Sequence, residues 1–152
     1  MSLILLINTN VFSQDVIQIG EVENNIKLGP FAGNRDMAFG VQNILEEIIQ
    51  DKGYDLSSNA DISLHVELLY FDVKKTNVQL AVYSKNTDAT QIIAKAHIRK
   101  NGKKKKSVVA KGIAKSISTA TLIIDKGGKF SQTNVSTALK KVCEELIEKL
   151  KL

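Results

Sequence analysis

The chain has no tryptophan, and cysteine, proline and histidine are scarce, with one Cys, one Pro and two His among 152 residues. A lone cysteine cannot form an internal disulfide, and two histidines are too few for the usual zinc-ligand sets. We therefore predict no metal and no cofactor. A domain of this length buries about 68–70% of its unfolded surface, so it can hold a core without such cross-links. The composition, 43% hydrophobic and 24% charged, predicts one globular domain.

Acidic residues are missing from one long stretch. No Asp or Glu lies between Asp88 and Asp125, yet nine of the 21 basic residues do. The other twelve basic residues are outnumbered by 16 acids, so the basic character belongs to one local feature. This feature falls on a predicted hairpin over residues 95–115.

Two interpretations of this hairpin remain open. Clustered lysines can neutralise phosphates or other anionic groups without reading a sequence. The candidate residues for an anionic surface are Lys95, Arg99, Lys103, Lys104, Lys105, Lys106, Lys111 and Lys115. Strand alternation places Lys103 and Lys105 on one face and Lys104 and Lys106 on the other. The alternative is a solvated turn whose lysines deter pairing between sheet edges. The hairpin has no aromatic residue on which bases could stack, which weakens a single-stranded nucleic-acid interpretation.

No set of residues predicts catalysis, so we expect a protein that is not an enzyme. The carboxylates of Asp36, Asp72, Glu46 and Glu47 are expected to be solvated or to cap helices. The sequence Gly127-Gly128-Lys129 lacks the spacing of a phosphate-binding loop.

The histidines and the cysteine have structural interpretations too. His65 and His97 fall on predicted strand faces, with no nucleophile elbow nearby. Cys143 lies within the apolar stripe of the last predicted helix, which favours core packing over a reactive thiol.

The N-terminus begins with a short apolar run, Leu3–Ile7. Val11 and Ser13 are small enough to precede a signal-peptidase site, so residues 1–14 are predicted to be a signal and 15–152 the domain. This interpretation places the protein in the periplasm or otherwise outside the cytoplasm. The run is short, however, and no Lys or Arg precedes it. If it is instead a buried strand, the protein is cytoplasmic.

Helical spacing marks two segments. Met37, Val41, Ile44, Leu45 and Ile48 form one apolar stripe, with Asn34 as a predicted cap and Gly53 as a left-handed stop. Gly40 inside this helix is expected to allow close approach to a sheet.

A second helix follows near the C-terminus. Its apolar stripe runs from Val135 to Leu150, with Asn134 or Thr133 as the predicted cap.

Strand signals lie before and between these helices. We predict two short extended pieces, Val16–Val22 and Ile26–Leu28, and a half-buried strand from Ile62 to Leu68. A turn is predicted at Lys74–Asn77, and a strong hairpin signal stands at Asn101-Gly102. The even positions of the return strand are small, which would let a helix lie close: Val108, Ala110, Gly112, Ala114 and Ser116. The expected fold is α+β, with two helices packed on one face of an antiparallel sheet of about four strands.

Three stretches resemble the YajG-type family of bacterial envelope lipoproteins. They are Arg35-Asp36 through Lys52-Gly53-Tyr54, the strand from Ala60 to Val73, and Ala94–Gly102 with its Lys-Asn-Gly turn and final helix. Together they cover roughly residues 34–150. The family carries its lipid on a cysteine directly after the signal, whereas the only cysteine here is Cys143.

The resemblance implies an envelope component without catalytic residues to carry over. We therefore expect a non-enzymatic exported envelope or assembly component that contacts other envelope proteins or copies of itself. The alternative is a cytosolic module that binds nucleic acid or another anionic polymer through hairpin 95–115.

Overall fold

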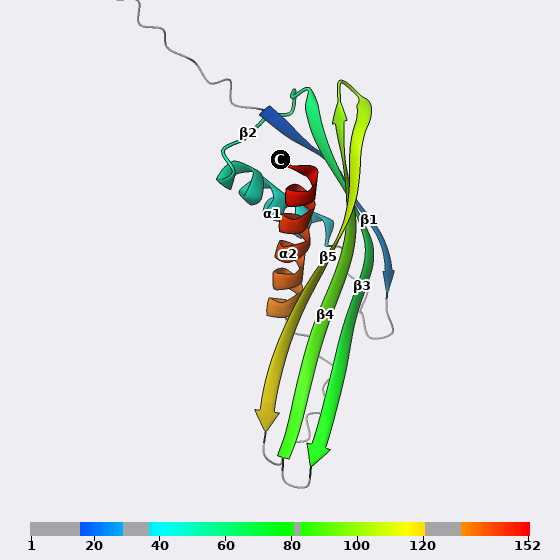
Figure 1. Cartoon of the computed structure of the whole chain (residues 1–152), viewed down its shortest axis with the longest axis vertical. Coiled ribbons are helices and arrows are strands. Elements are labelled where there is room, and N and C mark those ends of the chain that lie inside the picture. The colour runs from blue at the N-terminus through cyan, green and yellow to red at the C-terminus, as the bar shows by residue number, and fades with distance from the viewer. Residues whose placement is uncertain (1–15, 29–36, 81–82, 121–131) are drawn as a thin grey trace, which may run out of the picture.

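A computed structural model describes residues 16–28, 37–80, 83–120 and 132–152. The elements are β1 (Val16–Leu28), α1 (Ala38–Asp51), β2 (Asp55–Leu56), β3 (Ile62–Leu80), β4 (Tyr83–Lys100), β5 (Lys103–Ala120) and α2 (Gln132–Leu150). Both helices lie on one side of a single curved sheet (Figure 1). The predicted α+β class and the two helices on one face are confirmed. The predicted 1–14 segment, Gly127–Lys129 and Asp36 lie outside the described residues.

The sheet differs from the prediction in its direction and number of strands. It has five strands in the order β2-β1-β3-β4-β5, and only β3, β4 and β5 are mutually antiparallel. β1 pairs in parallel with both β2 and β3. The chain crosses over the sheet through α1 after β1, and such a crossover brings the next strand back in the same direction.

β1 is one continuous strand where the sequence predicted two pieces. Its register against β3 shifts between Ile19 and Val22 and again between Asn24 and Lys27. Each shift is typical of a β-bulge, which adds a residue without ending the strand. The polar residues between the two apolar groups therefore belong to the same strand.

Of the two turns predicted between strands, one is wrong and one is confirmed. The turn predicted at Lys74–Asn77 is wrong, because β3 continues to Leu80 and pairs with β4 throughout. At this end of the sheet β3, β4 and β5 extend past both helices (Figure 1). Because no described helix covers the strands there, a polar sequence is compatible with a strand. The Asn101-Gly102 turn is confirmed, with φ of 50° and 74°.

The core lies between the helices and the sheet. α2 packs on β4 and β5, while α1 packs on β1 and against α2. The small even positions of β5 face α2 as predicted, and Ala110, Gly112 and Ala114 are buried. Cys143 is fully buried in this layer, which confirms core packing. Burial raises the pKa of its thiol to about 12, and the neighbouring Glu144 adds to the shift.

The helix ends confirm the predictions only in part. Gly53 has a φ of 85° after α1, as predicted. Asn34 lies outside the described residues, and Met37 at the start of α1 makes no side-chain cap hydrogen bond. α2 begins at Gln132, so Asn134 lies in its first turn, and its Nδ2 donates to Ser116 Oγ on β5 at 2.8 Å. Asn134 therefore ties the helix to the sheet.

Candidate functional site

The side of the sheet opposite α1 and α2, called here the outer face, is covered by no described element. Alternation along β5 turns Val109, Lys111, Ile113 and Lys115 to this side, because the residues between them are packed under α2. Val109 is 50% exposed and Ile113 is 37% exposed. Two large apolar side chains thus stand among lysines on an open sheet surface.

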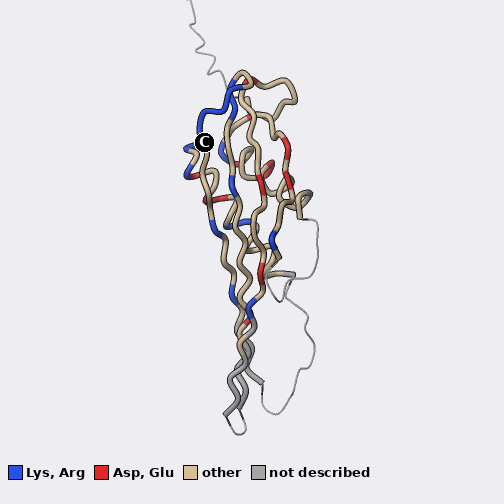
Figure 2. The backbone as a smooth tube through the Cα atoms, turned by 90° about the vertical axis from the view of Figure 1, so that its right-hand side faces the viewer, with Lys and Arg blue, Asp and Glu red and all other residues tan. Residues whose placement is uncertain are grey.

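Five basic residues gather on the β4–β5 half of the outer face. Lys95 pairs with Val109, Arg99 pairs with Lys104, and Lys111 pairs with Ile93. We call this set the basic strip: Lys95, Arg99, Lys104, Lys111 and Lys115. Figure 2 shows the basic residues concentrated near the C-terminal end of α2 and along the neighbouring strands.

The structure changes the predicted sorting of the hairpin lysines. The register shifts between Ile98 and Arg99, so that Arg99 pairs with Lys104 and Lys105 is the extra residue. The simple alternation predicted for the tip is therefore wrong, because a bulge at Lys105 reverses the faces beyond it. Lys103 pairs with Lys100 beside the turn. Whether the eight predicted residues bind an anion stays a prediction.

Lys106 points to the helix side. Its Nζ donates hydrogen bonds to the carbonyl oxygens of Lys149 and Leu150, the second at 3.2 Å. These carbonyls end α2, where the helix dipole favours a positive charge. Lys106 therefore caps a helix and is separate from the basic strip.

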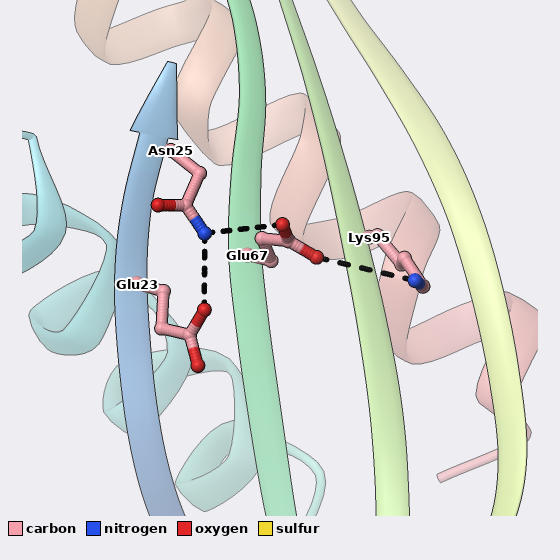
Figure 3. Close-up of polar contacts among 4 residues, drawn as sticks. All are labelled: Glu23, Asn25, Glu67 and Lys95. Atoms are coloured by element: carbon pink, nitrogen blue, oxygen red, sulfur yellow. Dashed lines mark hydrogen bonds and ion pairs between the residues drawn. The ribbon is translucent and has the colours of Figure 1, made fainter.

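The β1–β3 half of the outer face is more acidic, with Glu23 and Glu67 at its centre and Lys27 and Lys74 farther along the strands. Asn25 Nδ2 donates to Glu23 Oε2 at 3.0 Å and to Glu67 Oε1 at 3.1 Å, so one amide bridges two carboxylates (Figure 3). Lys95 Nζ lies 3.9 Å from Glu67 Oε2 and joins this group to the basic strip. Sequence reasoning missed the group because it depends on the parallel pairing of Glu23 with Glu67.

The two histidines meet between these halves. His65 and His97 are paired across β3 and β4, and their rings stack at a centroid distance of 4.9 Å and an angle of 6°. His65 Nε2 lies 3.1 Å from Ser63 Oγ. A Cβ placed on Gly20 would lie 2.7 Å from the His65 ring, so the ring packs directly over this glycine. Both histidines lie on strand faces, as predicted. The contact between their rings depends on the register of β3 against β4, which the sequence alone does not show.

Burial lowers the pKa of both histidines from the ordinary value of 6.5. For His65 the next cause is the Arg99 charge, and Glu21 and Glu23 oppose it. For His97 the further causes are His65, Lys104, Arg99 and Lys95. The rings are therefore uncharged at neutral pH.

The candidate carboxylates do not converge. Asp72 is only 2% exposed, so its predicted solvation is wrong; it accepts from the Tyr70 hydroxyl at 3.2 Å and from the Val73 amide at 2.9 Å. Glu47 lies 3.7 Å from Lys140, as expected for a solvated surface pair. Glu46 accepts from Gln42 at 3.1 Å.

Besides a hollow of 320 Å³ on α2, a shallow cavity of 240 Å³ lies where β2 ends and β1 continues. Its lining is formed by Gln18, Ile19, Gln42, Glu46, Leu56, Ser57 and Ser58. Glu46 is the single ionisable residue among them. Over the described ranges no three His, Cys, Asp or Glu side chains are grouped to hold a metal. Neither described helix is long and apolar enough to cross a bilayer.

Comparison with known proteins identifies the fold and no family. No family model matches the chain, and no curated protein matches it. A crystal structure from Helicobacter pylori, described as a neuraminyllactose-binding hemagglutinin homolog, shares 11% identity at a TM-score of 0.54, covering 91% of this chain and 86% of that one. A hypothetical protein from Chlamydia trachomatis shares 6% identity at a TM-score of 0.53, covering 91% and 96%.

A lipoprotein from Neisseria meningitidis shares 11% identity over 91% of this chain and 98% of that one, at a TM-score of 0.48, which is too low to establish a common fold. At these identities the two higher-scoring structures share a fold with this chain and carry over no functional residue.

Proposed function

We propose that this protein is an exported, non-enzymatic component of the bacterial envelope that works by contact with another protein or with a surface. The observation that carries the proposal is the open outer face, where acidic and basic halves lie side by side. Such a face suits recognition of a partner. The cavity beside β1 and β2, by contrast, brings only one ionisable residue to its walls, and the hollow on α2 is lined by residues of that helix alone.

Two further observations support the proposal. The Helicobacter pylori protein that shares this fold is described by a binding activity, as a hemagglutinin homolog. The YajG-type resemblance over residues 34–150 supports a role like that of envelope lipoproteins. Cys143 is buried in the core, so it is not the lipid-bearing residue of such a protein. The YajG-type assignment itself is part of the proposal.

Export is tested by fractionating the native host and measuring the mass of the purified protein. The proposal expects the protein in the envelope or periplasmic fraction, with an N-terminus at Gln14 or Asp15. Cytosolic protein that retains Leu3–Ile7 would contradict it.

The rival function is a cytosolic module for nucleic acid, with the basic strip as its site. The alignment of five basic residues on one half-face favours it. The affinity of such binding falls steeply as salt is added. On duplex DNA, each phosphate contact adds about 0.9 to the slope of the logarithm of the binding constant against the logarithm of the salt concentration. Titration of the protein with duplex DNA at several salt concentrations would reveal it.

A further inference from the structure

We propose that the basic strip, together with Val109 and Ile113, is a docking surface for an anionic lipid bilayer. The inference rests on the proposed envelope function for its setting and names the partner of the outer face. It concerns the β4–β5 half of that face and leaves the acidic β1–β3 half turned away from the lipid.

The arrangement interleaves cations with apolar side chains. Along β5 the exposed residues alternate as Val109, Lys111, Ile113 and Lys115. Across the sheet Val109 pairs with Lys95, while Lys111 pairs with Ile93. Every apolar side chain of this group therefore has a cation beside it along the strand or across it.

The cations are free to meet a partner. Within the described residues, Arg99, Lys104, Lys111 and Lys115 have no carboxylate at ion-pair distance, and Lys95 has one only at 3.9 Å. Other lysines of this region are occupied: Lys106 caps α2, and Lys141 and Lys149 donate to carbonyl oxygens of β5. Desolvating the strip would thus break few internal contacts.

The apolar residues distinguish a bilayer from a dissolved polyanion. A polyanion offers charge alone, so it leaves Val109 and Ile113 in water, whereas the headgroup region offers anionic groups above acyl chains. Along residues 87–116 of β4 and β5, the outer face holds no Trp, Phe or Tyr on which bases could stack. The chemistry of the strip therefore fits lipid better than nucleic acid.

Position on the sheet makes this contact feasible. β5 is an edge strand, and the acidic residues Glu23 and Glu67 lie on β1 and β3, on the other half of the face. A molecule tilted onto the β5 side brings the basic strip to a flat surface first. The acidic half then stays farther from the anionic headgroups.

The test measures binding of the purified chain to vesicles of phosphatidylglycerol and phosphatidylcholine, and to vesicles of phosphatidylcholine alone. Wild type should bind the anionic vesicles preferentially. Each basic residue near such a surface strengthens binding by about fivefold, so K111Q/K115Q should weaken it by about 25-fold. The matched control K52Q/K140Q removes two lysines on the helix side and should leave binding nearly unchanged. Equal losses from both pairs would overturn the proposal.

A second variant separates lipid from polyanion. V109S/I113S keeps every charge and should weaken vesicle binding several-fold while leaving heparin binding unchanged. Unchanged vesicle binding by V109S/I113S would overturn the proposal. Tighter binding to heparin or duplex DNA than to vesicles would then identify a polyanion as the partner. Circular dichroism on each variant confirms that the comparison is made on folded protein.

These outcomes are independent of export. Vesicle binding by a protein that proves cytosolic would leave the docking surface standing and reject the envelope function. An exported protein that does not bind anionic vesicles would reject the docking surface and leave the envelope function standing.

Discussion

Two glycines show how differently single positions in one core tolerate a methyl group. A Cβ on Gly112 of β5 would overlap the carbonyl oxygen of Ala138 and lie 2.9 Å from the amide nitrogen of Val142, both in α2. A Cβ on Gly40 of α1 would meet only Leu139 Cδ1, at 3.9 Å. The expected close approach of Gly40 to the sheet is therefore wrong, because this residue faces α2 at ordinary contact distance. Gly112 is the site of close approach.

Alanine at the two positions should have opposite effects. Gly112→Ala pushes α2 off β5 and should lower the free energy of unfolding by about 1–3 kcal/mol or more. Gly40→Ala removes a flexible residue from a helix and should raise it by about 1 kcal/mol. Urea unfolding of both variants measures the effect. A Gly112→Ala protein as stable as wild type would contradict this close packing of α2 on β5.

The histidine stack predicts a dependence of stability on pH. Both pKa values are lowered in the folded protein, mainly by burial, so the unfolded chain binds protons first as the pH falls. Stability from this pair is full above the ordinary value of about 6.5 and is lost as the pH falls through the lowered folded values. Thermal unfolding between pH 7.5 and 5.5 should show this loss in wild type and much less of it in H65Q/H97Q. NMR titration midpoints at or above 6.5 would show that the rings are not held uncharged.

At the scale of elements, α2 both covers the core and closes one edge of the sheet. Lys149 Nζ donates to the carbonyl oxygen of Val109 at 2.9 Å, and Lys141 Nζ donates to that of Ile113 at 3.1 Å. Glu145 Oε2 accepts from the Lys111 amide at 3.4 Å. The three residues are spaced by four along one helix side, so they follow the edge of β5 and occupy groups that another strand could pair with.

Removing these donors should expose the edge of β5. K141A/K149A should lower the free energy of unfolding by about 1–3 kcal/mol, since each lost hydrogen bond contributes about 0.5–1.5 kcal/mol. The folded variant should also associate increasingly with concentration, because the edge of β5 is open to another strand. Light scattering after size exclusion measures the association. K52A/K140A removes the same charge away from the edge and should stay as dispersed as wild type. Association by both pairs alike would point to lost charge instead of edge protection.

Local patterns predicted most elements, and long-range pairing decided the rest. The helical stripe ending at Gly53, the small positions of β5 and the Asn101-Gly102 turn follow from spacing and backbone preference, and all three are confirmed. The direction of β1 depends on how α1 crosses the sheet, which its own sequence does not encode. The bulge at Lys105 likewise depends on the fit between β4 and β5. Of the eight predicted basic residues, five therefore share the outer face.

The whole molecule has its charges divided across one open face. The net charge of +5 arises from the β4–β5 side, whereas Glu23 and Glu67 mark the β1–β3 side. Both helices lie on the opposite side of the sheet, so they leave this face available (Figure 1). A protein with this division should orient in an electric field near a charged surface before it makes contact. We propose that the β4–β5 half of the outer face is the surface by which the protein meets the membrane in the envelope.

Photo-crosslinking in the native host tests which face of the protein meets the membrane. A benzophenone amino acid replaces Val109 on the outer face in one strain and Ser136, exposed on α2, in another. After irradiation, intact-mass analysis identifies what each site has captured. We expect phospholipid adducts at Val109 in the envelope fraction and few at Ser136. Equal adducts at both sites, or adducts at Val109 to nucleic acid alone, would contradict it.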